Sequence, residues 1–257
     1  MRLNIVPAQQ GAVWARLGIR MFWRQPLAFT GLFFIFMTVL SVCSLIPVLG
    51  NFLALALIPA ATLGLMAATR EVELGKFPMP TVLAVAFRAG NAKKRDMMIL
   101  GVLYAFGLIG VMMLTALVDG GAFARIYLMG AALDTETLMR PEFQNAVWLS
   151  LLFYMPLSAL FWFAPALVHW HGVPAIKSLF FSAVACMRNW RAFLVYGLMW
   201  MFIFVGTLLA ISLVSSLLDG DFAAAAMLPA TLMLAAMFFC SIYFSFRDSF
   251  VADTHYA

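Results

Sequence analysis

The sequence predicts an all-α polytopic membrane protein, in which six transmembrane helices form a bundle and amphipathic helices lie at the membrane interface. Of the 257 residues, 65% are hydrophobic and only 11% are charged, whereas a soluble domain carries about 25% charged residues. The apolar residues form continuous runs and do not alternate with the period of two that marks a transmembrane β-barrel. We therefore expect residues 1–257 to form a single integral membrane domain.

The first two spans come from one uninterrupted charge-free stretch, which runs from Gln25 to Thr69. A span needs roughly 20 apolar residues to cross about 30 Å of hydrocarbon, so this stretch is long enough for two. Pro47, Gly50 and Asn51 predict the turn between them. Four more charge-free windows follow, and the expected spans are residues 27–46, 50–69, 97–118, 145–168, 193–217 and 223–246.

Lys and Arg residues are distributed unequally between the two sides of the predicted bundle. The side with both termini and the second and fourth connections holds 14 of the 16 basic residues, and the other side holds Arg125 and Arg140. Because basic loops stay in the cytoplasm, we expect both termini to be cytoplasmic in a bacterial inner membrane. The basic excess is thus an orientation signal, and the sequence offers no basic patch on a soluble module that would bind nucleic acid.

Residues 11–24 predict a helix that lies in the inner membrane interface. Arg16, Arg20 and Arg24 recur every four residues and form one stripe on such a helix. The opposite face is apolar and contains Trp14, Leu17, Met21 and Phe22. We expect this apolar face to lie in the acyl-chain boundary and the three arginines to contact lipid headgroups, anionic ones in particular. The alternative is a plain anchoring flank before the first span.

The order of segments is consistent with a threefold internal repeat, although apolar segments also resemble each other by composition alone. Each unit holds a surface segment, a span, a turn and a second span that contains proline. The surface segments are Gly11–Arg24, Pro80–Arg88 and Pro174–Arg191. The second span contains Pro59 in the first unit, Pro156 and Pro165 in the second unit, and Pro229 in the third.

Pro59, Pro156 and Pro229 are expected to kink their helices, because each removes a backbone hydrogen bond within a span. Broken helices form the binding sites of many transporters. Ordinary kinks are also common in membrane helices, where neighbours satisfy the freed carbonyl. Both interpretations stay open at the level of the sequence.

The sequence offers no constellation for catalysis or for a cofactor. None of the six windows contains Asp, Glu, Lys, Arg or His, which argues against a proton-coupled pump, although hydroxyls and backbone groups can line a path for lipid. Cys43, Cys186 and Cys240 form no CxxC pair and are expected to act as small hydrophobic residues. His169 and His171 flank Trp170; positions two apart point away from each other on a helix, so interface anchoring is favoured over a metal site.

A set of short motifs is densest over residues 1–90: Leu3-Asn4-Ile5-Val6-Pro7-Ala8, Trp14, Gly18, Phe22, Arg24-Gln25-Pro26-Leu27-Ala28, Pro47-Val48-Leu49-Gly50 and Gly64-Leu65-Met66. Together they resemble an uncharacterised proteobacterial family of six-span inner-membrane proteins. More distantly, the layout is similar to the membrane domain fused to some glycerophosphodiester phosphodiesterases, whose catalytic domain has no counterpart here. The resemblance implies an integral inner-membrane protein and brings no activity and no site residues with it.

Two functions of different classes follow from these observations. The first is a non-enzymatic inner-membrane protein that organises lipids or partner proteins through its basic interfacial helices. The alternative is a passive transporter or lipid translocator that uses the proline-bearing spans as a path. A polar cavity beside Pro59 and Pro156 would favour the alternative, whereas a solid apolar bundle would favour the first. We expect membrane lipids as partners, no metal and no enzyme activity.

Overall fold

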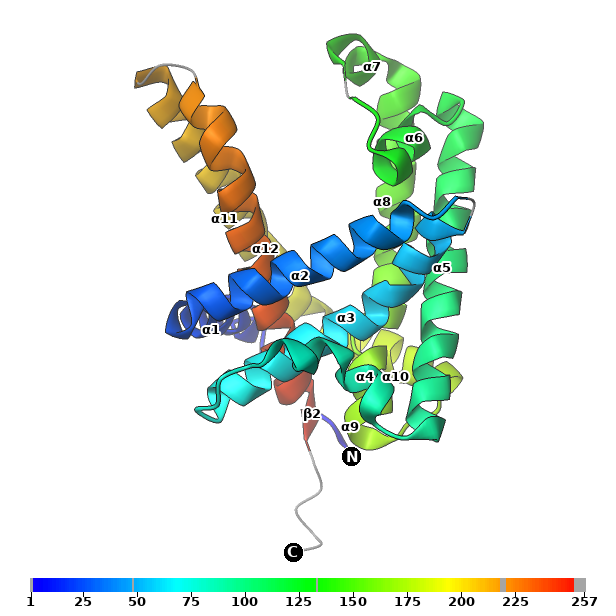
Figure 1. Ribbon diagram of the computed structural model, residues 1–257, viewed down its shortest axis with the longest axis vertical. Coiled ribbons are helices and arrows are strands. Elements are labelled where there is room, and N and C mark those ends of the chain that lie inside the picture. The colour runs from blue at the N-terminus through cyan, green and yellow to red at the C-terminus, as the bar shows by residue number, and fades with distance from the viewer. Residues whose placement is uncertain (1, 48, 133, 218–220, 252–257) are drawn as a thin grey trace, which may run out of the picture.

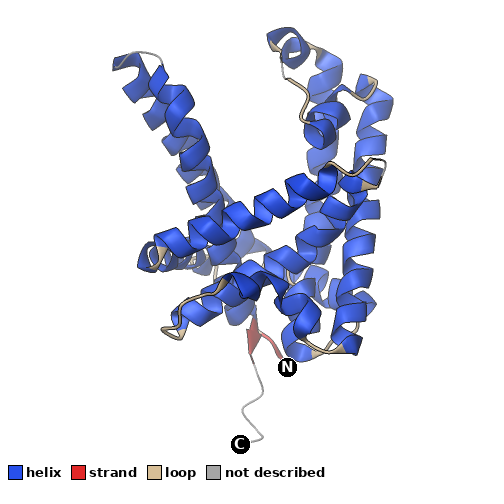
Figure 2. Cartoon of the chain, in the orientation of Figure 1, coloured by secondary structure: helices blue, strands red, loops and turns tan. Residues whose placement is uncertain are grey.

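The computed structural model describes residues 2–47, 49–132, 134–217 and 221–251. It is a set of helices joined by short turns, with one small sheet where the two ends of the chain meet (Figure 2). In this sheet, β1 (Arg2–Leu3) pairs antiparallel with β2 (Phe250–Val251). We call the end of the molecule that carries this sheet the proximal end, and the end that carries helices α6 and α7 the distal end (Figure 1).

Six long helical segments confirm the all-α class, and each is long and apolar enough to cross a membrane, in agreement with the six predicted spans. The fourth consists of two helices in succession, α8 and α9. The segments are α2 (Pro26–Ser44), α3 (Gly50–Glu73), α5 (Asn91–Asp119), α8 (Pro141–Phe161) with α9 (Ala164–His171), α11 (Trp190–Leu217) and α12 (Asp221–Ser249).

The predicted surface segments are also helical. Gly11–Arg24 corresponds to α1 (Gln10–Arg24), and Pro80–Arg88 corresponds to the 3-10 helix η1 (Pro80–Ala84) and to α4 (Val85–Arg88). Pro174–Arg191 corresponds to α10 (Ala175–Arg188) and the beginning of α11. Two further short helices, α6 (Ala122–Met129) and α7 (Thr135–Met139), connect α5 to α8. This order agrees with three similar units, but their threefold equivalence stays a prediction.

Helix α3 lies at the centre of the molecule, where it packs against α2, α5, α12 and η1. Its face of small residues, Ala60, Gly64 and Ala68, is buried. A Cβ atom on Gly64 would lie 2.7 Å from the Cα atom of Leu83 in η1. Small residues stabilise contacts between membrane helices because they let backbones approach closely. The composition of α3 therefore explains its central position.

Two pairs of helices diverge from this centre like the arms of a V (Figure 1). One arm consists of α5 and α8, and the other of α11 and α12, while the α2–α3 hairpin crosses between them. The long apolar side chains of α11 are mostly exposed; Leu198, Phe202 and Leu209 are examples. In a membrane protein, such a surface faces lipid tails.

The turn between α2 and α3 lies level with the middle of α5. Phe52, near the beginning of α3, contacts Phe106 in the middle of α5, with ring centroids 5.2 Å apart. Leu45 and Leu49 in this turn are exposed. The Gly50 amide donates to the Ile46 carbonyl at 2.9 Å, so the turn satisfies part of its own backbone. The hairpin therefore reaches only about half as far along the bundle as α5 does.

The fourth span is interrupted at Trp162 and Phe163, and Pro165 follows as the second residue of α9. Proline cannot donate to the carbonyl four residues earlier and its ring collides with the preceding turn, which explains the interruption. Ser182 of α10 satisfies the backbone there: its hydroxyl donates to the Ala159 carbonyl at 2.7 Å and accepts from the Phe163 amide at 2.9 Å.

The three prolines predicted to kink their helices do not lie at this interruption of the fourth span. Pro59, Pro156 and Pro229 are inside α3, α8 and α12, each of which is one continuous helix. The described part of the chain therefore has its interrupted span at Pro165, a proline that the sequence also places in the fourth span. Whether the other three prolines line a path stays a prediction.

Candidate functional site

Helix α1 presents the three predicted lipid-contacting arginines on one exposed face. Arg16, Arg20 and Arg24 are all exposed, as their four-residue spacing requires. Trp23 beside them is also exposed, which suits an amphipathic ring at a membrane interface. Their contact with headgroups stays a prediction.

The opposite face of α1 corrects the expectation that it lies among acyl chains. Trp14 and Phe22 are fully buried, and the helix packs against α11 and α12. Two glycines permit this packing: Gly11 meets the Ala192 carbonyl of α11, and Gly18 meets Ser241 of α12, so closely that a Cβ atom would overlap either neighbour. The apolar face therefore belongs to the protein core, and only the arginine face is available to lipid.

A polar network that the sequence did not predict fixes α1 at the proximal end. The Asp248 carboxylate of α12 accepts from the Gln10 amide at 2.7 Å and from the Trp14 indole N–H at 3.0 Å. Arg247 pairs with Asp248 and with Glu73 at the end of α3, and Tyr243 donates to Glu73 at 2.7 Å. The signal in the sequence was the indole N–H of Trp14, since a buried tryptophan needs a hydrogen-bond acceptor.

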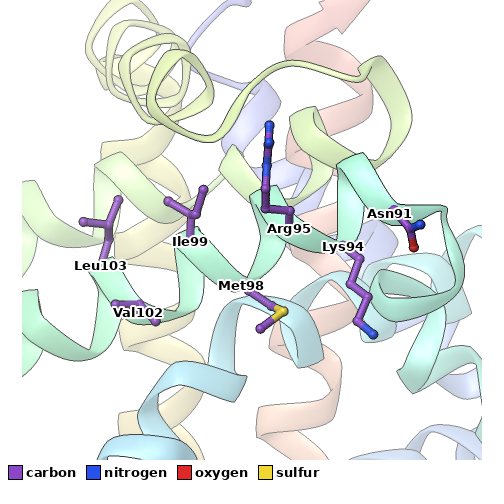
Figure 3. A pocket seen from close by; sticks show the side chains of 7 residues that line it. All are labelled: Asn91, Lys94, Arg95, Met98, Ile99, Val102 and Leu103. Carbon is purple, nitrogen blue, oxygen red and sulfur yellow. The ribbon is translucent and has the colours of Figure 1, made fainter.

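Three basic residues at the proximal end of α5 divide into two roles. The Lys93 ammonium donates to the His169 carbonyl at 2.7 Å, near the last turn of α9, where a cation complements the helix dipole. Lys94 and Arg95 are exposed and line a shallow hollow of about 570 Å³ along α5 (Figure 3). Lys93 is therefore structural, and the other two cations face the surroundings.

Each of these two cations heads an apolar stripe, as Figure 3 shows. Met98 and Val102 follow Lys94 at four-residue spacing, and Ile99 and Leu103 follow Arg95 in the same way. Residues four apart lie on the same helix face. The hollow thus combines a cationic end with an apolar wall, and all of its lining comes from one helix.

A second hollow of about 550 Å³ lies between α8, α10 and α11. We call it the α8–α10–α11 groove; Met155 and Ala159 line it from α8, Met187 from α10, and Gly197 and Met201 from α11. Its lining is almost entirely apolar. At its proximal end, the Arg191 guanidinium lies 5.5 Å from the centroid of the Trp190 ring, which also lines the groove.

A small cavity of about 120 Å³ lies beside Pro59, between α3, α5, α8 and α12. Four hydroxyl-bearing residues are among its lining side chains: Thr62, Tyr104, Tyr154 and Ser158. Thr62 and Ser158 donate to the carbonyls of Ile58 and Met155, in their own helices. The bundle is therefore not solid next to Pro59, and the cavity is lined by both hydroxyls and aromatic rings.

The three cysteines and both histidines of the sequence analysis lie within helices. Cys240 is buried and Cys43 is half-buried. Cys186 of α10 donates weakly to the Ala159 carbonyl at 3.7 Å, and burial raises the pKa of its thiol to about 12. His169 and His171 lie at the end of α9, where the His171 ring lies 5.8 Å from the Phe246 ring.

The comparison with known proteins finds one relative over nearly the whole chain. A probable inner membrane protein of Burkholderia thailandensis is 40% identical over 254 residues, which cover 97% of this chain and 94% of the relative. No family model matches the sequence, and no solved structure matches it. The resemblance to inner-membrane proteins is thereby confirmed, whereas the distant similarity to the membrane domain of glycerophosphodiester phosphodiesterases finds no support.

Proposed function

Because the chain belongs to the family of this probable inner membrane protein and is a multi-pass inner-membrane protein itself, we propose that it binds and organises anionic phospholipids of the inner leaflet. The observation that carries this proposal is the hollow on α5, where exposed Lys94 and Arg95 stand at the end of an apolar wall. An anionic phospholipid has the complementary form, a charged headgroup above an apolar tail.

The arrangement of charge and apolar surface favours the α5 hollow over the cationic row of α1. Each Lys or Arg near an anionic membrane surface contributes about 1 kcal/mol of attraction. Arg16, Arg20 and Arg24 form a second cationic row on α1, and their apolar neighbours are already buried in the protein. The α1 row therefore offers charge without a place for tails, whereas the α5 hollow offers both.

This proposal includes an orientation and a non-enzymatic role. We place the proximal end in the cytoplasm, because 14 of the 16 basic residues belong to that side of the predicted topology. The carboxylates of Asp248 and Glu73 at that end accept from Trp14, Tyr243 and Arg247. These bonds connect α1, α3 and α12, which supports a structural rather than a catalytic assignment for both acids.

The test is the lipid composition that the protein retains. The full chain is extracted in polymer-bounded native nanodiscs, and the ratio of phosphatidylglycerol and cardiolipin to phosphatidylethanolamine is measured by mass spectrometry. The wild type should exceed the ratio of the bulk membrane, and Lys94→Gln with Arg95→Gln should lower the excess by about fivefold for each cation removed.

The matched control removes the same charge at the other end of the bundle, with Arg125→Gln and Arg140→Gln. This variant should keep the wild-type ratio, because the proposal assigns these residues to the opposite leaflet. A wild-type ratio equal to that of the bulk membrane would contradict the proposal, as would equal losses in the two variants.

A second candidate is passive lipid translocation, and the arrangement of hollows along α8 favours it. The cavity beside Pro59 shares Ser158 and Trp162 with the α8–α10–α11 groove, and it shares Tyr154 with a distal hollow next to α6. Hydroxyls along this series can accompany a headgroup where no charge is present. Reconstitution with fluorescent phospholipids and dithionite quenching tests it: quenching beyond the outer-leaflet half supports translocation, and quenching of half the signal contradicts it.

A further inference from the structure

The α8–α10–α11 groove is lined by three helices, whereas the hollow on α5 is lined by one. Its lining includes the edge-to-face pair of Trp162 and Phe193, whose ring centroids lie 5.5 Å apart. The Ser158 hydroxyl and the Cys186 thiol donate to backbone carbonyls of α8 at 2.8 and 3.7 Å. These polar groups in the wall therefore have partners, and the groove presents a surface suited to an apolar occupant.

The length of the groove corresponds to one leaflet. It runs along α11 from Trp190 to Met201, and eleven residues of α-helix rise about 16 Å. The hydrocarbon core is about 30 Å thick, so one leaflet supplies about 15 Å. Trp190, Leu194, Leu198 and Met201 line the groove and are all exposed, so its α11 side is open to the surroundings along this stretch.

The proximal end of the groove carries positive charge. Arg191 lies over the Trp190 ring and is exposed, and Arg188 is exposed at the end of α10. An indole ring prefers the headgroup level of a membrane, where one side is apolar and the other is wet. A guanidinium held at that level is placed to bind a phosphate with two parallel hydrogen bonds.

From these features we propose that the groove holds one acyl chain of an anionic phospholipid, with the phosphate bound at Arg191. This assignment rests on the proposed function and adds a second, more enclosed site to it. The length of one leaflet and the cationic end both favour a lipid as the occupant. A helix from a second copy of the chain would not require a cation at one end of the groove.

The test blocks the groove without disturbing the backbone. A Cβ atom on Gly197 would meet no other atom within 4 Å, so Gly197→Phe can place a ring in the groove. Gly206 of the same helix is equally open and does not line the groove, so Gly206→Phe is the matched control. Both substitutions also replace a glycine within a helix by a residue of higher helix propensity.

The full chain is reconstituted in vesicles that contain phosphatidylglycerol with a photoactivatable diazirine in its acyl chain. After illumination, adducts are mapped by mass spectrometry. In the wild type, adducts on Met187, Leu194 and Met201 should exceed those on Leu209. Gly197→Phe should lower the groove adducts about tenfold, as expected for a filled site, and Gly206→Phe should leave them unchanged.

Charge is tested with Arg191→Gln and a zwitterionic probe. The substitution should lower groove adducts of phosphatidylglycerol about fivefold and leave those of a diazirine-labelled phosphatidylcholine unchanged. Adducts spread evenly over α11, or insensitive to Gly197→Phe, would overturn the groove assignment even if nanodiscs still retain excess anionic lipid. Crosslinks between two copies through Met187 or Met201 would identify a second chain as the occupant and overturn it as well.

Discussion

Helices α3 and α11 are both apolar enough to span a membrane, yet they have opposite environments. In the most apolar stretch of α3, 61% of the residues are buried inside the protein, against 6% in that of α11. Helix α3 carries Ala60, Gly64 and Ala68 on its buried face, whereas α11 carries long side chains such as Leu209 on an exposed one. Side-chain size rather than hydropathy thus separates the helix that packs against protein from the helix that faces lipid.

The largest expected effect tests the close packing around α3. A Cβ atom on Gly101 of α5 would overlap the Ala56 carbonyl of α3, whereas one on Gly110, farther along α5, would meet nothing within 4 Å. Gly101→Leu should therefore lower the free energy of unfolding by about 3 kcal/mol or more. Gly110→Leu should stay within about 0.5 kcal/mol of the wild type. Unfolding in mixed micelles at increasing dodecyl sulfate measures both, and similar losses would contradict the packing.

A second pair of variants compares the two helices directly. Leu63 of α3 is fully buried, and Leu209 of α11 is exposed. Leu63→Ala should cost about 2–5 kcal/mol, because it leaves a cavity. Leu209→Ala should cost about 0.5 kcal/mol or less, because lipid fills the space. The same unfolding titration applies, and a large loss from Leu209→Ala would mean that the exposed face of α11 packs against protein in the membrane.

The polar network at the proximal end should have a smaller effect. Asp248→Ala leaves the Trp14 indole and the Gln10 amide without their acceptor, which should cost about 2 kcal/mol. The control is Glu136→Ala, which breaks the exposed ion pair with Arg140 and should cost less than about 1 kcal/mol. A cysteine introduced at Trp14 or Gly18 for labelling would itself disturb the packing of α1. Release of α1 in the Asp248 variant is therefore measured by hydrogen exchange of its backbone amides. Unchanged protection of α1 would contradict its attachment through Asp248.

The smallest perturbation concerns the depth of the α2–α3 turn. A spin label at Leu49 leaves the fold intact because this side chain is exposed. The turn lies level with Phe106 in the middle of α5, and its sequence carries no charge, whereas the turns after α5 and α11 carry Asp119 and Asp219. Depth measurements with paramagnetic reagents should place Leu49 deeper than a label at Leu117. Equal, shallow depths would show that the hairpin crosses the whole bilayer.

The spans could be predicted from the sequence because the hydrocarbon thickness imposes their length and excludes charge. Ala60, Gly64 and Ala68 are small residues spaced four apart in the sequence, a spacing that favours a packing face on a membrane helix. The attachment of α1 was not predicted, because an apolar face on a basic helix suits acyl chains and protein equally. Gly11 and Gly18, seven residues apart on that face, are the features that distinguish the two cases, since they allow contact with the backbones of α11 and α12.

The candidate sites depend even more on the three-dimensional arrangement. The cation row of α1 follows from residue spacing alone. The α8–α10–α11 groove joins Met155, Met187 and Met201 from three helices, and no local pattern brings these residues together. The helix is interrupted near Pro165 because the Ser182 hydroxyl there satisfies both freed backbone groups, the Phe163 amide and the Ala159 carbonyl. The sequence shows the prolines but does not show this hydrogen-bond partner.

The central claim, preferential binding of anionic lipid, is tested most directly by electron paramagnetic resonance of the reconstituted chain with spin-labelled lipids. The fraction of motionally restricted label is compared for phosphatidylglycerol and phosphatidylcholine at low and high salt. We predict a larger restricted fraction for phosphatidylglycerol, with a difference that falls as salt screens Lys94, Arg95 and Arg191. Equal restricted fractions for the two lipids at low salt would contradict the account.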